Sequence, residues 1–394
     1  MRIELSNAAK KTTSYIVSVL GAAGTALQNY IAVELFLRGI VSGFTSISRL
    51  LSGVLHAVSI GVGGVCSGTV NYFINVDLLD GFLERITSKK SGPELSGWRK
   101  FTYYGGIFVF AVTGVLFGMT AFTFSMATPL SVLALASGVF VAMIMTIQEI
   151  ETWLQGFDDP ESDGKESLYA LFLKWKSTLT WGKACGHIIA AGNVLALSLL
   201  FTLGLAEVLM AMSVAAFPAF VIGLSVAFTF GAFTEFYFYN FFLAKFCHQF
   251  KANWEGMQAS SHAVFGMICI STNAFVNAAL TYSGVGLLSG ALAVAGIALP
   301  PAWVITALSV VSAIFAGGAS FILGMDFWIR KQGICSMEKS KTVTPEAIVP
   351  KKPSKYVEQD EPCCLIGIRL FSDAKVSGHN VKVAAEPSSI QNAA

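Results

Sequence analysis

Residues 184–208 read ACGHIIAAGNVLALSLLFTLGLAEV, and this stretch decides the class of fold. Glu207 is its one side chain that is charged at neutral pH, and most of the others are apolar. An α-helix of about 20 apolar residues spans the hydrocarbon core of a bilayer, because each residue adds about 1.5 Å to its length. The stretch therefore predicts a transmembrane helix.

The composition of the whole chain agrees with a lipid environment. Of the 394 residues, 54% are hydrophobic and 13% are charged, whereas soluble domains carry about 25% charged residues. The mean hydropathy is +0.64. A formal net charge of +2, with no basic run interleaved with aromatic residues, argues against a nucleic-acid partner. We therefore expect the lipid bilayer to be the main partner of this chain.

Seven further apolar runs, each of about 22 to 28 residues, accompany this stretch. We predict eight transmembrane helices, at residues 13–37, 51–77, 102–124, 129–151, 184–208, 215–242, 261–282 and 302–328. Consecutive helices pair as hairpins at about 13–77, 102–151, 184–242 and 261–328. The predicted fold is an all-α polytopic transmembrane helical bundle over residues 13–331, with about eight helices arranged as four parallel hairpins.

The distribution of Lys and Arg predicts the orientation of these helices. Of the 26 basic residues, all but Arg38 and Arg49 fall on one side of the predicted spans. Cytoplasmic loops of membrane proteins carry an excess of Lys and Arg. We therefore expect a multi-pass protein whose N-terminal residues 1–12 and C-terminal tail, residues 332–394, both lie in the cytoplasm.

Three segments depart from the regular pattern. Residues 167–180 combine apolar bulk with Lys174 and Lys176, which is typical of an amphipathic interfacial helix or of an extension of the next span. Residues 284–299 are apolar but short for a crossing, so they are either re-entrant or a continuation of the seventh helix. Residues 332–394 cannot bury a core, so a disordered tail is expected.

The four hairpins share a recurrent ending. Each second helix ends in acidic residues that aromatic residues follow, and this pattern returns about every 75 to 90 residues. Internal duplication explains the recurrence. The ordinary enrichment of aromatic residues at membrane boundaries explains it equally well.

Ionisable residues inside the bilayer are the main functional candidates, because a charge there is costly and usually faces a bundle interior or a wet cavity. Glu235 precedes Lys245 by about ten mostly apolar or aromatic residues, so in a helix its carboxylate lies roughly 15 Å from that cation. It is either the central group of a transport site or a protonated structural residue. Glu34, by contrast, has a local partner in Arg38 at i,i+4, and we expect an ion pair there.

Four further acids fall near the ends of the other second helices: Asp77, Glu149, Glu151 and Asp326. Carboxylates at a helix C-terminus oppose the helix dipole, so their recurrence is informative. If the hairpins pack around one axis, these acids line a cytoplasmic vestibule that attracts cations, as charged rings do in channels. The alternative is that they are solvated helix ends.

Two histidines and two asparagines occur in the fifth and seventh helices: His187, Asn193, His262 and Asn273. They are candidates for a polar relay or for metal ligation. Lone helical histidines more often bond to a neighbour, and the seven cysteines lack the spacing of a metal site. The sequence therefore assigns no metal, and we expect no cofactor.

Motifs of soluble enzymes do not occur in the chain. There is no phosphate-binding loop, no His-Glu-x-x-His and no Gly-x-Ser-x-Gly, so we expect no enzymatic activity. The intramembrane acids favour a secondary transporter or channel for a small cation or solute. The alternative is a membrane-embedded adaptor or scaffold, whose cytoplasmic tail engages a protein partner without any transport.

Overall fold

The structure is a computed structural model that describes residues 7–87, 97–126, 128, 131–157, 180–234, 247–260 and 262–331. Every regular element in these ranges is a helix. Eight of the helices are long and apolar enough to cross a membrane. The chain is therefore an integral, multi-pass membrane protein with an all-α fold, as the sequence predicts.

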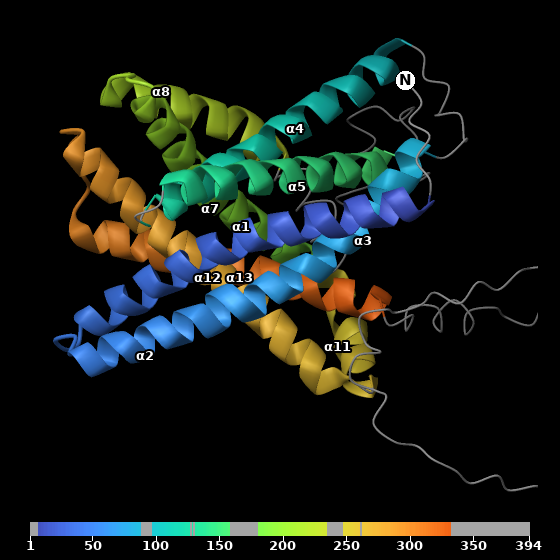
Figure 1. The fold of residues 1–394 in the computed structure, drawn as a ribbon, viewed down its shortest axis with the longest axis horizontal. Helices are drawn as coiled ribbons and strands as arrows, with labels where there is room; N and C mark the ends of the chain where they lie inside the picture. The colour runs from blue at the N-terminus through green and yellow to red at the C-terminus, as the bar shows by residue number, and fades with distance from the viewer. Residues whose placement is uncertain are drawn as a thin grey trace, which may run out of the picture. The chain divides into compact units, whose positions relative to one another are not determined.

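The helices form four hairpins, which we label A to D, each with a first and a second helix (Figure 1). Hairpin A joins α1 (Asn7–Ser42) to one continuous helix composed of α2 (Arg49–Ser59), η1 (Ile60–Cys66) and α3 (Ser67–Thr87). Hairpin B consists of α4 (Gly97–Ser125) and α5 (Ser131–Phe157). Hairpin C consists of α7 (Trp181–Ala211) and α8 (Ala216–Val226) with η2 (Ala227–Gly231). Hairpin D consists of α12 (Ala263–Val294) and α13 (Ala302–Lys331), and the short α11 (Phe250–Ala259) precedes it.

Residues 284–299 belong mostly to α12, which continues to Val294. Gly296 then adopts a φ of +73°, which glycine tolerates well, and its neighbour Ile297 donates its N–H to the Leu292 carbonyl at 3.0 Å. This cap ends the helix before Pro300 and Pro301. Of the two interpretations of this segment, the continuation of the seventh helix is confirmed.

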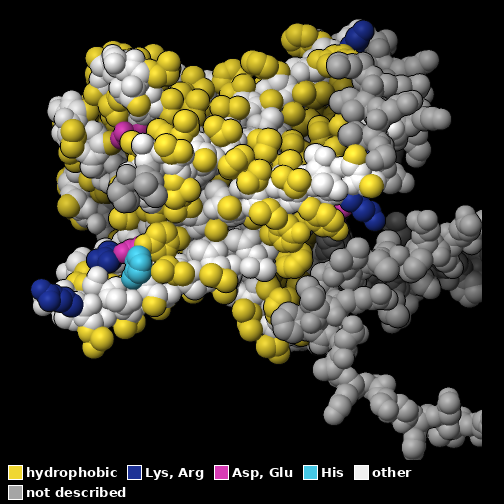
Figure 2. All heavy atoms as spheres, in the orientation of Figure 1, with side chains coloured by type: hydrophobic (Ala, Val, Ile, Leu, Met, Phe, Trp, Pro, Cys, Tyr) yellow, Lys and Arg dark blue, Asp and Glu magenta, His cyan; other side chains and the backbone are white. Residues whose placement is uncertain are grey.

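The surface agrees with a lipid-facing bundle. Figure 2 shows one face of the molecule covered by hydrophobic side chains, with the visible Lys, Arg, Asp and Glu side chains toward the ends of the helices. Large apolar side chains such as Val132, Phe217 and Ile314 are well exposed on the helices. Contiguous exposed apolar surface is unfavourable in water but matches the hydrocarbon of a bilayer.

The hairpins pack in a cyclic order. Each first helix contacts the first helices of both neighbouring hairpins, so that α1 and α7 each pack against α4 and α12. Each second helix also contacts the first helix of the preceding hairpin: α5 packs against α1, η2 against α4 and α13 against α7. Finally, η1 and α3 pack against α12, which closes the ring.

An apolar core fills the centre of this ring. Leu116 and Phe124 of α4 pack with Leu200 and Phe201 of α7, and none of the four is more than 2% exposed. Leu200 also lies against Gly284 of α12, where an added Cβ would overlap its side chain. In the described part of the chain, the centre is therefore packed and forms no open pore.

Hairpins A and B are repeated by hairpins C and D. Nine of the ten buried positions of α1 are also buried in α7 at a constant shift of 172 residues, as between Ser14 and Gly186. Seven of the eight buried positions of α5 are buried in α13 at a shift of 175 residues, as between Ile144 and Ala319. These two helix pairs therefore relate a first half, A with B, to a second half, C with D, through a shared burial pattern.

Packing contacts between helices repeat as well. Gly106 of α4 lies against the Trp153 ring of α5, and Gly266 of α12 lies against the Trp328 ring of α13. The first pair is related to the second by a shift of 160 residues from α4 to α12 and of 175 residues from α5 to α13. A chance resemblance of boundary aromatics would not reproduce the glycine beneath each ring, so a duplication of a two-hairpin unit is supported. The recurrence of single hairpins about every 75 to 90 residues stays a prediction.

Among the residues that the structure describes, each half contains one π-helical segment, in the second helix of hairpins A and C. Gly63 of η1 packs on the backbone of Asn29, where an added Cβ would lie 2.6 Å from the carbonyl oxygen. Gly231 of η2 packs on the Phe201 ring, and Phe201 is the counterpart of Asn29 at the shift of 172. Such π-turns are rare and occur often at functional sites.

Candidate functional site

Two buried carboxylates occupy equivalent positions in the two halves. Glu151 is 2% exposed and Asp326 is 4% exposed, and the shift between α5 and α13 relates one to the other. Glu151 lies two residues before Trp153, and Asp326 lies two residues before Trp328, the two tryptophans that pack on glycine. A carboxylate this deep is costly unless a proton, a cation or hydrogen-bond donors compensate for the lost water.

Arg85 of α3 holds the Glu151 carboxylate in hairpin B. Its Nε lies 3.0 Å from Oε2 and 3.3 Å from Oε1, and its Nη2 lies 3.2 Å from Oε1. A guanidinium that donates to both carboxylate oxygens makes one of the stronger ion pairs in proteins. The Arg85 side chain is 33% exposed while that of Glu151 is 3% exposed, so the cation links a buried acid to the outer part of the bundle.

Polar contacts continue from this ion pair toward the middle of the same interface. Gln148, one turn before Glu151 on α5, donates from Nε2 to Asn75 Oδ1 at 2.6 Å. Beside this interface, within hairpin A, the Ser14 hydroxyl of α1 donates to the Val76 carbonyl of α3 across a long 3.5 Å. The contact between hairpins A and B therefore carries a polar track through otherwise apolar helices.

The second half places its acid among different neighbours. Asp326 lies on α13, which packs against α7 and α11. The adjacent Met325 is fully buried with Met257 of α11. On α7, Asn193 is buried and His187 is partly buried. The duplication has thus kept the position of the buried carboxylate on the second helix of hairpins B and D.

The remaining predicted acids are less deeply placed. Asp77 on α3 and Glu149 on α5 are both partly buried. Glu149 forms no ion pair or hydrogen bond within the described ranges. Glu235, the strongest candidate from the sequence, lies outside the described residues, as do the predicted tail and almost all of the amphipathic segment 167–180.

The other two members of the predicted relay make local contacts. His262 is exposed just before α12, where its backbone N–H donates to Ser260 Oγ at 3.2 Å. Asn273 accepts from Asn277 Nδ2 through its carbonyl oxygen at 2.9 Å and its Oδ1 at 3.4 Å. Among the residues that the structure describes, no group of three His, Cys, Asp or Glu is placed to hold a metal ion.

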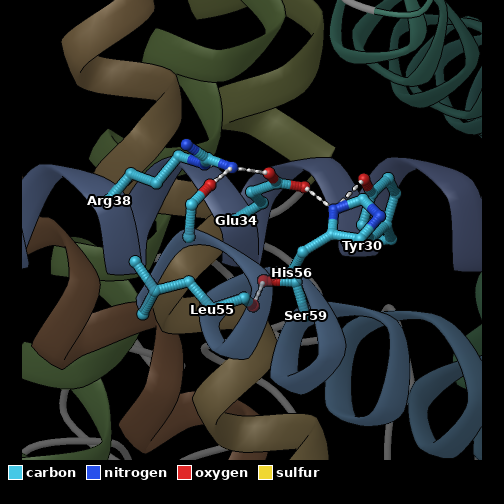
Figure 3. A network of polar contacts seen from close by, with 7 residues as sticks. Tyr30, Glu34, Arg38, Leu55, His56 and Ser59 are labelled. Carbon is cyan, nitrogen blue, oxygen red and sulfur yellow. Dashed lines mark hydrogen bonds and ion pairs between the residues drawn. The ribbon is translucent and has the colours of Figure 1, made fainter. Parts of the chain in front are cut away.

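A polar network near the other end of hairpin A joins α1 to α2 (Figure 3). Arg38 donates from Nε to Glu34 Oε1 at 2.8 Å and from Nη2 to Ser52 Oγ at 3.0 Å. His56 Nδ1 lies 3.1 Å from Glu34 Oε2 and 3.0 Å from the Tyr30 hydroxyl. The predicted ion pair between Glu34 and Arg38 is confirmed.

Sequence reasoning missed the histidine and tyrosine of this network. Tyr30, Glu34 and Arg38 follow one another at intervals of four, which places them on one face of α1. Ser52 and His56 have the same spacing on α2. Those spacings were the available signal, but only the packing of α1 on α2 brings the two faces together.

Comparison with known proteins adds no relative: no family model, no curated protein and no solved structure matches this chain. Interpretation of the site therefore depends on its own geometry. Its main features are a buried acid repeated in both halves, a polar track in the first half, and a packed centre between the four first helices.

Proposed function

We propose that the protein is a secondary transporter for a small cation or solute. The observation that carries this proposal is the pair of buried carboxylates, Glu151 and Asp326, at equivalent positions of two repeated halves. Many secondary transporters are built from internal repeats and bind substrate and coupling ions at the interface between the repeats. Ionisable groups inside a membrane commonly mark such ion paths.

The packed centre favours a transporter over an open channel. A channel needs a continuous wet path, whereas Phe124 and Leu200 fill the middle of the ring in the described residues. Transport by rocking of one half against the other needs no permanent pore. The π-segments η1 and η2 lie in equivalent second helices, where an irregular turn eases bending.

Flux measurements on purified protein in liposomes test this proposal. The wild-type protein is expected to dissipate an imposed proton or alkali-cation gradient faster than protein-free vesicles. Glu151→Gln and Asp326→Asn keep the size of each side chain but remove its charge, so each is expected to lower the flux by about tenfold or more. Glu235→Gln belongs in the same series as a prediction from the sequence alone.

The matched control is Glu84→Gln, which removes an exposed acid next to Arg85 on α3. It is expected to keep the wild-type flux. Melting temperatures of all variants separate loss of transport from loss of folding. Wild-type vesicles that are no leakier than empty ones, for any of the ions tested, would rule out the transporter.

A second candidate is a membrane-embedded adaptor without transport. The observation in its favour is the ion pair between Arg85 and Glu151. A structural acid needs such a fixed partner, whereas a transport site has to exchange its ion. An adaptor predicts that deletion of residues 332–394 abolishes recruitment of a protein partner. A transporter predicts that the same deletion leaves the flux unchanged.

A further inference from the structure

A buried amide lies between α1, α3 and α5 with one of its donors unused. Asn75 is 2% exposed, and its Oδ1 accepts from Gln148. Its Nδ2 points at Gly21 of α1, where an added Cβ would lie 3.3 Å away. Nδ2 has no hydrogen-bond partner within the described residues, and neither has the fully buried Ser18 Oγ, about one turn from Gly21.

The second half also has a buried asparagine with an unused donor, at the position that corresponds to Gly21. The shift between α1 and α7 converts Gly21 into Asn193, which is 3% exposed and whose Nδ2 also lacks a partner in the described ranges. Ile144 packs on Gly21, and the counterpart of Ile144 on α13, at the shift of 175 residues, is the small Ala319. The amide comes from α3 in one half and from α7 in the other.

An unused buried donor is expensive, and its repetition is informative. Leaving a buried amide N–H without an acceptor costs about 1–3 kcal/mol. Buried water molecules typically form about three hydrogen bonds with such groups. A small neutral acceptor fits here better than an anion, because Glu151 lies only two turns from the residue that faces the amide.

We propose that each half holds buried water at this amide, bound by Asn75 and Ser18 in the first half and by Asn193 in the second. These waters relay protons to and from the equivalent acids Glu151 and Asp326. Ile144 and its counterpart Ala319 each precede the acid on their own helix by seven positions, or about 10.5 Å along the helix. Gln148 lies along this path in the first half and hydrogen-bonds Asn75 without itself passing a proton, so the waters span the distance.

The relay requires no net chemical change along the path. Each water oxygen accepts one proton and releases another to its neighbour, and the carboxylate at the end gains a proton or loses it. The proton is then the ion that the protein moves or couples to its solute. This assignment rests on the proposed transport function, whereas the hydration of the two amides does not.

Water-edited solid-state NMR on protein in lipid bilayers tests the hydration directly. Magnetisation is transferred from water to the side-chain amides of asparagine. The amides are assigned through their own Cβ and Cγ in the wild-type protein, so the outcome does not depend on the folding of a variant. Asn75 and Asn193 are expected to gain strong water cross-peaks.

Asn29 is the matched internal control. It is 5% exposed, and its Nδ2 donates to Ser67 Oγ at 2.7 Å, so its donor is already used by the protein. Its cross-peak is expected to build up much more slowly than those of the other two. Equal, slow build-up at all three asparagines would overturn the hydrated sites.

Flux in liposomes tests the proton assignment. A pH gradient is expected to drive flux that falls in Asn193→Leu and in Asn75→Asp, which keeps the acceptor for Gln148 but removes the unused donor. Flux that follows a sodium gradient and ignores pH would overturn the proton relay while leaving the transport function intact. Hydrated amides without flux of any ion would overturn both the relay and the transport function.

Discussion

At the residue scale, the contact between Arg85 and Glu151 explains how a carboxylate persists inside an apolar bundle. A charge removed from water loses several kcal/mol of hydration, which a single well-placed guanidinium recovers only with good geometry. Here both carboxylate oxygens accept from the guanidinium, at 3.0–3.3 Å. The ion pair therefore adds little net stability. Its main effect is to fix the position of α3 against α5.

Removal of the cation alone is expected to be costly. Arg85→Leu leaves Glu151 buried without its guanidinium, so the free energy of unfolding is expected to fall by about 3–5 kcal/mol. The double variant Arg85→Leu/Glu151→Leu removes both charges and is expected to lose much less. Thermal unfolding in detergent measures the difference, with the exposed Glu84→Leu as control. Additive losses would contradict the coupling.

The Cys247 thiol offers a pH-dependent test outside the apolar spans. Burial raises the pKa of Cys247 to about 11, and the neighbouring Cys185 thiol adds to the shift. A raised pKa means less thiolate at neutral pH, by about tenfold for each unit. In a variant whose only thiol is Cys247, which keeps the larger effect of burial but loses that of Cys185, alkylation is expected to be slow at pH 8 and to keep accelerating well above pH 9. A rate that levels off near pH 9 would show that the thiol is not buried.

At the element scale, glycine decides how closely helices pack. Membrane helices associate through small residues, since lipid provides no hydrophobic drive between them. On α4, Gly114 lies against the Thr146 backbone and Gly118 against Ala142, so this face of the helix accepts no side chain. The sequence shows many such glycines but does not show which of them face a neighbouring helix.

Two adjacent glycines on α4 provide a matched test. A methyl group at Gly106 would overlap the Trp153 ring, whereas one at Gly105 would meet no atom within 4 Å. Gly106→Ala is therefore expected to destabilise the protein by about 1–3 kcal/mol through overpacking. Gly105→Ala is expected to be neutral or slightly stabilising, because alanine favours helix by up to about 1 kcal/mol. Equal melting temperatures for the two variants would argue against this packing.

At the scale of the whole molecule, the two halves bury equivalent positions of their helices but differ in which helix carries the larger side chain. Gly21 with Ile144 in the first half corresponds to Asn193 with Ala319 in the second. One small and one large residue fill the interface in each case, on opposite helices. Such compensation is expected when two copies of one unit diverge while the volume of the interface is conserved.

Exchange of the two pairs tests this relation. Gly21→Asn alone is expected to destabilise strongly, because an added Cβ would already lie 2.9 Å from Ile144 Cγ2. Ile144→Ala alone is expected to cost about 2–5 kcal/mol through a cavity. Together they copy the pair of the second half and are expected to cost less than the sum. Thermal unfolding of all four proteins measures this coupling, and strict additivity would contradict the equivalence.

The predicted orientation is open to labelling with a membrane-impermeant maleimide in a cysteine-free background. Met212→Cys and Val294→Cys place exposed thiols at one end of the helices, and Ile86→Cys and Lys251→Cys place them at the other. The excess of basic residues predicts that only the first two react in intact cells. All four are expected to react after permeabilisation. The reverse pattern would invert the topology.

The sequence by itself determined the number of helices, their hairpin pairing and the ion pair between Glu34 and Arg38. These features depend on local properties, because hydropathy is a sum over neighbouring residues and an i,i+4 contact follows from the helical repeat. The acids that recur before aromatic residues also pointed to Glu151 and Asp326.

The tertiary structure decided what local patterns do not contain. Glu151 meets Arg85 across 66 residues, and His56 reaches Glu34 from the next helix. The duplication has shifts of 172 residues for α1 and 160 for α4, because connections of different length separate the helices, so no single period appears in the sequence. Which side chains lie between hairpins and which fill the centre depends on how the helices pack. That packing alone buried the two acids at equivalent positions and left an amide in each half, Asn75 and Asn193, without a partner among the described residues.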